Sequence, residues 1–474
     1  MAEPTYEQLR EENQRLKRRV AELERTVREQ ARQIAALKSL VERLQQELEK
    51  SQREAKRQAA PFSKGPPQAK ARRPGRKAGP DYGRQNFRRP PDPAEIDETY
   101  EARLPECCPG CGGQMAETGV RQQYQVELPQ KPIQRQFHVH LGRCTCCGLA
   151  VQGRHELMTS DALGAAGSQL GARVQALMVF LNKRLGLSQG KIAELFTRAL
   201  GIPATRGGVM HVVLRSGRRL EPAYGKIRQR VRGSPFVVPD ETGWRLGGRS
   251  AWLHACVGRD ATCYEIAESR GAEVMAGLLG WDYRGTMIHD GWAPYDGFLE
   301  ARHQQCLAHI FRRCRRLLDT ARGGAVRLPR AVLDVFGQAI AVRDRFDAGE
   351  VCGHGRRVLA GRLRERLRRL VALVKSHAAN ERLAAHLESH LDDWFTFLRV
   401  DGVDATNWRA EQAIRPAVVN RKVWGGNRTG CGARAQSVLM SVLATCYQQG
   451  CDPLRLLTDT LRSRSPRISF AVER

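Results

Sequence analysis

Two features are scarce in this sequence: long apolar runs and acidic side chains. No run of 18 apolar residues occurs, which argues against a membrane-spanning helix. The N-terminus begins with alternating Glu, Gln and Arg, which is not a signal-peptide pattern. We therefore expect a cytoplasmic protein with no membrane partner. Most of its 14 cysteines should be reduced thiols or metal ligands rather than disulfides.

The shortage of acidic residues leaves a large positive charge. Asp and Glu number 50 against 78 Lys and Arg, a net charge of +28. This surplus favours a polyanionic partner, because each neutralised phosphate releases counterions. At 474 residues the chain also exceeds one typical domain. We expect a multidomain, nucleoid-associated protein that binds DNA.

Residues 1–52 carry a heptad repeat. One core position holds Leu9, Leu16, Leu23, Leu37 and Leu44, and the other holds Val20, Val27, Ile34, Val41 and Leu48. Leu at d with β-branched residues at a favours a parallel two-stranded coiled coil, in which Asn13 and Gln30 would fix the register. We predict a homodimer or higher oligomer; a single solvated helix is the alternative.

Residues 53–99 are predicted to form a flexible basic linker. From Arg53 to Pro90 the chain carries twelve Lys or Arg, two acids and repeated Pro and Gly. The linker could lie along phosphates or act as a plain tether.

Residues 100–156 are predicted to form a zinc ribbon. Cys108-x-x-Cys111 and Cys144-x-x-Cys147 match the spacing of four thiolates around a structural Zn²⁺. Short strands are expected between the two pairs. The ribbon would contact DNA or serve only as a structural staple.

Residues 157–232 are predicted to be helical. Ser188 and Thr205 can cap two helices that flank Gly201-Ile202-Pro203. This outline fits a DNA-binding helix-turn-helix. A helical hairpin that packs on the catalytic core fits equally well.

Three acids give the sequence its candidate catalytic chemistry. Asp240 follows the apolar run in "PFVVPDETGW", Asp290 follows a second run in "YRGTMIHDGW", and Glu411 lies in the helical "DATNWRAEQAIRPAV". We expect Asp240 to end a strand before a Thr-Gly turn. Carboxylates of this kind can hold two divalent ions roughly 3.5 to 4 Å apart for phosphodiester chemistry. Mg²⁺ or Mn²⁺ suits such oxygen ligands.

The segments around these acids predict a multidomain α/β protein. "FVVPD", "GWRLGG", "SAWLHACVG" and "ATCYEIAE" read as a three-strand meander. With the strand before Asp290 they predict an RNase H-like core over 233–305 and 400–450. Residues 306–399 are expected to be an inserted helical domain, and 451–474 a C-terminal tail. One helix of the insertion should bury Leu359, Leu363, Leu367, Leu370 and Val374.

The motifs "DETGW", "HDGW", "CLAH" and "TNWRAEQAIRP" follow the Cys-x-x-Cys pairs in a specific order. In this the chain resembles the TnpC-type DDE transposases of the Insertion Sequence Sixty-Six family. The resemblance implies that Asp240 and Asp290 are metal-binding aspartates and Glu411 the third acid. It departs at Gln412, where that family usually has Arg.

Five further residues complete the set of candidates. Cys306 and His309 resemble a Cys-x-x-His element of other transposase groups, and we expect them to pack or hydrogen-bond near the site. Asn407, Arg415 and Arg421 could position DNA beside Glu411, since Arg pairs well with phosphate. Helix capping is the competing role for Asn407.

The sequence thus predicts a metal-dependent DDE transposase with a structural zinc ribbon. Its partners would be the DNA of element ends and target, a second copy of the chain, and helper proteins from the same element. Two alternatives stay open: an RNase H-like structure-selective nuclease, and a catalytically inactive DNA-binding regulator that descends from a transposase.

Overall fold

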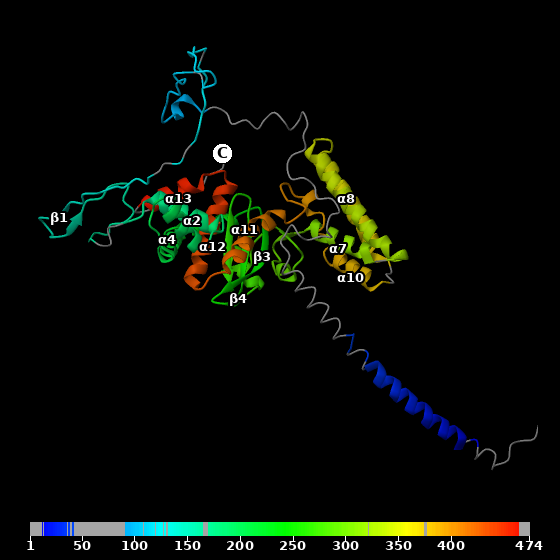
Figure 1. Cartoon of the computed structure of the whole chain (residues 1–474). Coiled ribbons are helices and arrows are strands. Elements are labelled where there is room, and N and C mark those ends of the chain that lie inside the picture. The colour runs from blue at the N-terminus through cyan, green and yellow to red at the C-terminus, as the bar shows by residue number, and fades with distance from the viewer. Residues whose placement is uncertain are drawn as a thin grey trace, which may run out of the picture. The chain divides into compact units, whose positions relative to one another are not determined.

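The chain is described from a computed structural model (Figure 1). The structure describes residues 12, 14–35, 37, 40–41 and 91–463, the last range with gaps at 108, 119, 127, 129–130, 165–168, 321 and 374–376. The chain divides into two units, Met1–Val126 and Glu127–Arg474.

The first unit contains an N-terminal helix. Residues 14–35 are helical throughout, and the heptad side chains among them are exposed on the single chain. The pairing of two such helices stays a prediction. The unit also contains the 3-10 helix Pro93–Glu95 and a single β-bridge between Cys107 and Gln114. Residues 53–90 of the predicted linker lie outside the described residues.

The second unit is built around one five-stranded sheet. Its strands are β3 (Phe236–Leu246), β4 (Arg249–Val257), β5 (Thr262–Ala267), β6 (Thr286–His289) and β7 (Arg302–Gln305). Their order is β5-β4-β3-β6-β7, with β3, β4 and β5 antiparallel and β6 and β7 parallel to β3. The predicted meander is therefore present. Gly247 and Gly248 join β3 to β4 and both have positive φ, as a tight two-residue hairpin requires.

One group of helices covers one face of this sheet (Figure 1). The group comprises α2 (Ala172–Lys183), α3 (Gln189–Ala199), α4 (Arg206–Arg219), α5 (Glu221–Arg232), α6 (Ala272–Leu279), α12 (Gly430–Gln448) and α13 (Pro453–Arg462). Their apolar side chains share a core with Val237 of β3 and Met287 of β6.

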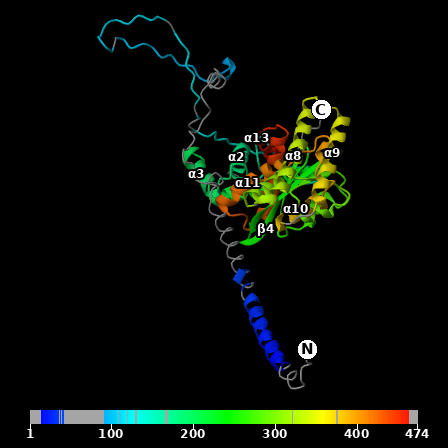
Figure 2. The same cartoon turned by 90° about the vertical axis from the view of Figure 1, so that its right-hand side faces the viewer.

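The opposite face is covered by α11 (Trp408–Trp424) and by the helical insertion. The insertion comprises α7 (Leu307–Thr320), α8 (Arg327–Asp347), α9 (Gly353–Ala372) and α10 (Ala378–Ser389). Figure 2 shows α8 and α9 running beside each other. Phe236 and Val238 of β3 pack against this insertion, whereas Trp244 packs against α11. Val237, between the first two, packs instead with the first group of helices, so that alternate residues of β3 face different helical layers.

The two predicted helix caps are confirmed. Ser188 accepts a hydrogen bond from the backbone N–H of Lys191 at the start of α3, and Thr205 accepts one from Gly208 at the start of α4. Helix α4 packs along α12 and contributes to the same core as the sheet. That packing matches the helical-hairpin interpretation, while binding of DNA by these helices stays a prediction.

Helix α12 also closes the free edge of β5. Hydroxyls one helical turn apart accept backbone N–H groups of alternate strand residues: Ser437 from Ile266, Ser441 from Tyr264 and Thr445 from Thr262. An open edge strand would present these groups to another chain. The spacing of four residues on the helix matches that of two on the strand, so the edge is sealed by side chains.

Several elements differ from the sequence-based expectations. Strand β3 does not end at Asp240 but runs on through Thr242 and Gly243, because its pairing with β4 continues to the hairpin. Of the strands expected between the cysteine pairs, the described residues contain only Leu141–Arg143 (β1), which pairs across the second cysteine pair with Ala150–Gln152 (β2).

Two further differences concern helix ends. The segment expected to be a tail contains α13, whose Leu457 and Leu461 are buried in the core shared with α2. In α9, Leu363 and Leu367 are buried as expected, but the helix ends at Ala372. Val374 lies outside the described residues. None of the described helices is both long and apolar enough to span a bilayer.

Candidate active site

Two of the three candidate acids come from neighbouring strands of the sheet. Asp240 lies in the middle of β3, beyond the point where β3 stops pairing with β6 at Val237 and Met287. Asp290 directly follows β6, where its carboxylate accepts the backbone N–H of Trp292 at 3.0 Å. By strand alternation, Asp240 points to the sheet face that α11 and the insertion cover.

The third acid comes from the first turn of α11. Glu411 is exposed there. Arg421, two to three turns further along the helix, donates to the carbonyl oxygen of Gly243, and its guanidinium lies 3.5 Å from the hydroxyl of Thr242. This contact holds α11 against the part of β3 that follows Asp240. Arg421 therefore acts within the protein as a link between helix and strand, whereas Arg415 is exposed on α11.

The three carboxylates are close enough to repel one another. Burial raises the pKa of Asp240 to about 7, and the nearby charges of Glu241, Asp290 and Glu411 add to the increase. A hydrogen bond from the backbone N–H of Glu241 opposes it only in part. A partly buried carboxylate beside other carboxylates is typical of sites that bind a cation or handle protons.

Glu241, the other acid of "DETGW", is held on the opposite face. Its side chain is only 4% exposed and forms an ion pair with Arg270 at 2.6 Å. Tyr295 donates a hydrogen bond to its second oxygen at 2.9 Å. The guanidinium of Arg270 lies over the rings of both Trp252 and Trp292. Both carboxylate oxygens of Glu241 are therefore occupied by contacts within the protein.

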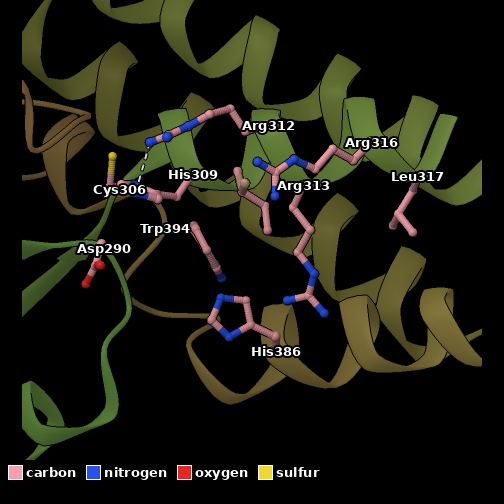
Figure 3. A pocket seen from close by; sticks show the side chains of 10 residues that line it. Asp290, Cys306, His309, Arg312, Arg313, Arg316, Leu317, His386 and Trp394 are labelled. Atoms are coloured by element: carbon pink, nitrogen blue, oxygen red, sulfur yellow. Dashed lines mark hydrogen bonds between the residues drawn. The ribbon is translucent and has the colours of Figure 1, made fainter. Parts of the chain in front are cut away.

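A pocket of about 580 Å³ opens beside Asp290 (Figure 3). Its wall is formed mainly by α7, with His386 of α10 and Trp394 opposite. At its edge Arg312 donates to Nε2 of His309 at 2.9 Å and forms an ion pair with Glu411 at 3.3 Å. A guanidinium therefore neutralises the third acid in this conformation.

Cys306 and His309 connect the insertion to the site. The Cys306 thiol donates to the side-chain oxygen of Asn407 at 3.1 Å, and the backbone N–H of Asn407 lies 3.4 Å from the sulfur. Asn407 is 2% exposed and stands at the N-cap position of α11, but its side chain makes no capping bond. These contacts fit the structural role expected for Cys306 and leave Asn407 little surface to offer DNA.

The donor set suits a hard divalent ion, since all three acids offer carboxylate oxygens. Within the described part of the chain, however, no group of three or more His, Cys, Asp or Glu side chains is arranged to hold a metal ion as it stands. Glu411 is instead paired with Arg312. Binding of an ion by all three acids requires Glu411 to leave Arg312.

The predicted zinc ligands are described only in part. Cys108 lies outside the described residues, Cys111 belongs to the first unit, and Cys144 and Cys147 belong to the second. Around the second pair the chain forms a tight turn, in which Gly148 has positive φ and donates to the carbonyl oxygen of Cys144. Backbone N–H groups of Cys147 and Cys146 lower the pKa of the Cys144 thiol. This turn favours the thiolate that a zinc ion requires.

The structure thus brings Asp240, Asp290 and Glu411 to one region and adds two residues that the sequence analysis missed. Arg312 follows "CLAH" within an arginine-rich stretch, which was the available signal for it. Arg270 lies in the loop before α6, and nothing in its local sequence indicates that it pairs with Glu241.

Comparison with known proteins relates the chain to one family. No curated protein matches the chain. The sequence model of the transposase IS66 family matches residues 167–435, more than half of the chain and a range that includes all three acids. The chain belongs to the IS66 family of transposases.

Proposed function

We propose that the chain is a DDE transposase that cleaves DNA and transfers the cut strand, with Asp240, Asp290 and Glu411 as its catalytic acids. The second unit supports an RNase H-like core, because a three-strand antiparallel meander is extended by two parallel strands on its first strand. In this arrangement the acids come from the central strand, the end of its neighbour and a helix on one face.

The observation that carries the proposal is the electrostatic conflict among the acids. Asp240 has its pKa raised to about 7 by burial and by neighbouring carboxylates. A site that gathers negative charge in this way favours cations over a metal-free state. Mg²⁺ or Mn²⁺, two per site and held by these three acids, would supply activation of the attacking water or hydroxyl and stabilisation of the leaving oxygen.

The protein's own residues have separate tasks in this mechanism. Arg421 fixes α11 against β3, so that Glu411 faces the aspartates. Arg270 and Tyr295 hold Glu241 on the opposite face of the sheet. Of these two adjacent acids, Asp240 is therefore the one that would act on the substrate. A first attack by water would free a 3′-hydroxyl at the element end. That hydroxyl would then attack target DNA without a covalent protein intermediate.

The remaining parts of the chain are proposed to assemble and hold DNA. The N-terminal heptads would pair two chains. Cys108, Cys111, Cys144 and Cys147 would hold one structural Zn²⁺, which predicts one equivalent of zinc in metal analysis of the purified protein. Arg415, exposed on α11 beside Glu411, is proposed to contact DNA backbone.

The test is a strand-transfer assay with labelled DNA that carries the element's own ends. Purified protein is incubated with Mg²⁺ or Mn²⁺ beside the Glu411→Gln variant, which preserves side-chain size. Joined products from the wild type alone are expected. Loss of the carboxylate should reduce the rate by at least about a hundredfold, on the order of 3 kcal/mol in the barrier.

Other outcomes favour the alternative functions. Cleavage without joining would indicate a structure-selective nuclease of the same fold. Specific binding without cleavage, with the element's helper proteins present, would indicate an inactive regulator. Equal activity of the wild type and Glu411→Gln would remove Glu411 from the mechanism.

A further inference from the structure

The pocket beside Asp290 has a chemistry that the three acids do not explain. Arg312, Arg313 and Arg316 line it from one helix, α7, and Asp290 is the one carboxylate in its lining. Figure 3 shows Arg313 extending from α7 toward His386 across the pocket. Arg312 also pairs with Glu411, so three guanidiniums stand against two carboxylates, and this excess of positive charge favours an anion as the occupant.

Arg313 is a half-buried cation without a compensating carboxylate among the described residues. In the part of the chain that the structure describes, it has no carboxylate within ion-pairing distance. Burial lowers its pKa, and the nearby Arg382 of α10 lowers it further. A half-buried cation next to a second cation is unfavourable unless an anion joins them.

The other residues that line the pocket favour an anion over a stacked nucleobase. Trp394 is only 2% exposed, and its indole N–H is already donated to the carbonyl oxygen of Leu387 at 3.1 Å. It therefore offers no free ring face on which a nucleobase could stack. Burial and the adjacent Arg313 lower the pKa of His386 to about 4, so that it is neutral at physiological pH. A neutral imidazole can still donate one hydrogen bond.

The pocket is joined to the candidate active site. A Cβ placed on Gly291, the residue after Asp290, would lie 3.4 Å from Cε1 of His386, so α10 rests on the loop that carries this acid. At the other side Arg312 contacts Glu411. An anion in the pocket therefore lies next to the acids.

We propose that this pocket binds a backbone phosphate of the DNA strand that enters the active site, through Arg313 and Arg316, and that Arg312 exchanges Glu411 for the same strand. The inference rests on the proposed transposase function, since it names how that site holds its substrate. It also assigns a role to the insertion: α7 presents the arginines, and α10 closes the pocket from the other side. Release of Glu411 from Arg312 then accompanies DNA binding.

The test compares two full-length variants with equal loss of charge. Arg313→Gln/Arg316→Gln removes pocket cations, whereas Arg315→Gln/Arg330→Gln removes two exposed cations that do not line the pocket. Binding to a labelled duplex carrying one element end is measured in Ca²⁺ over a range of salt concentrations. The pocket variant should bind roughly tenfold more weakly. Its slope of log K against log salt should be smaller by about 0.9, as expected for one lost phosphate contact.

Neutral methylphosphonate linkages, placed one at a time along each strand, locate the contact. The wild type and the control should lose affinity at one or two linkages near the cleaved bond, and the pocket variant should be insensitive there. A pocket variant with the wild-type pattern at every linkage would overturn the proposal, as would a control with the same altered pattern. If the pocket variant does not fold, Arg316→Gln, which removes an exposed side chain, gives the same comparison.

The two proposals can fail separately. If the wild type binds the duplex but never cleaves it with Mn²⁺, the transposase mechanism fails, and the methylphosphonate pattern still decides the pocket. If the wild type cleaves and joins while the pocket variant matches it in binding, slope and pattern, the pocket proposal fails alone.

Discussion

Asp240 is a partly buried carboxylate near other acids. The proposed metal site requires this placement, which lowers the stability of the folded protein without a metal. Its carboxylate is partly buried on β3, faces two other acids, and is held by one backbone N–H. Without a cation the ionised form is penalised, which is why its pKa is raised to about 7. The cost falls on the folded protein alone, because the unfolded chain solvates the same carboxylate.

Replacing Asp240 by Asn is expected to stabilise the metal-free protein. Between about pH 4 and pH 7 the folded state binds more protons at Asp240 than the unfolded state, so this residue makes the free energy of unfolding fall as pH rises. Asp240→Asn should remove this slope and raise stability at pH 7.5 on the order of 2 kcal/mol. It should also abolish the rise in Tm that we expect Mn²⁺ to give the wild type.

Thermal unfolding in EDTA and in Mn²⁺, at pH 5 and pH 7.5, measures both effects. Asp282→Asn, at an exposed carboxylate paired with Arg232, is the matched control and should leave both unchanged. A variant at Asp240 that keeps the Mn²⁺ shift would show that this residue is not a metal ligand.

At the residue scale, the sequence indicated which acids are candidates for the site, but not which side chains they contact. Each acid could be selected because it follows an apolar run or lies inside a recognisable motif. The pairing of Glu411 with Arg312 joins residues 99 apart in the chain. It depends on the fold, which brings the start of α7 to the start of α11 through the contact of Cys306 with Asn407. Likewise, Asp240 and Glu241 are adjacent acids that lie on opposite faces of the sheet. The contacts of Glu241 with Arg270 and Tyr295 show which face Glu241 occupies, and the sequence does not predict these contacts.

Helix α12 shows what close packing demands of an element. A Cβ on Gly217 of α4 would lie 2.7 Å from Cβ and 2.9 Å from Cα of Ala435 on α12. The two helices therefore approach each other at small residues. Helix α4 therefore packs directly on α12, the helix that hydrogen-bonds the edge strand β5. A change in the distance between α4 and α12 would also affect the contact of α12 with the sheet.

Gly217→Ala is expected to destabilise the protein by about 1–3 kcal/mol, because the backbone of α12 must move to admit the methyl group. Gly225→Ala on α5 is the control: a Cβ there meets nothing within 4 Å, and the alanine should stabilise the helix by about 0.5–1 kcal/mol. Urea unfolding of both variants gives the comparison. Equal changes of either sign would contradict the close approach of α4 and α12.

The elements were predictable where local chemistry specifies them. Ser188 and Thr205 cap helices as expected, because N-caps depend on residues within one turn. The extent of β3 was not predictable from "DETGW", since a Thr-Gly pair reads as a turn until pairing with β4 extends the strand. Strand β7, whose sequence Arg-His-Gln-Gln is wholly polar, was missed for a similar reason: its pairing with β6 makes it a strand.

At the scale of the whole molecule, the N-terminal helix presents an apolar row that is exposed in the described part of the chain. Leu16, Val20, Leu23, Val27 and Ile34 are each more than half exposed. They occupy the two core positions of the heptad. A contiguous row of large apolar side chains in water is a strong indication of an interface. The sequence predicts the occupant, since Leu at d and β-branched residues at a favour a second parallel copy.

Charge placed in this row should separate the chains. Leu16→Asp/Leu23→Asp inserts carboxylates into the predicted seam, where two copies would bring like charges together without solvent. Size-exclusion chromatography with light scattering should therefore report half the wild-type mass. Ala21→Asp/Ala35→Asp is the matched control, because both residues are helical and occupy the outer b position of the same heptad repeat, so that the dimer should persist. If the seam variant keeps the wild-type mass, the heptads do not hold the two copies together. If the control variant also dissociates, the added negative charge, and not its place at the core positions, causes the dissociation. Loss of the dimer with cleavage retained would show that the acids act within one chain. If joining of the ends were lost at the same time, the coiled coil would be needed for the proposed strand transfer and not for cleavage.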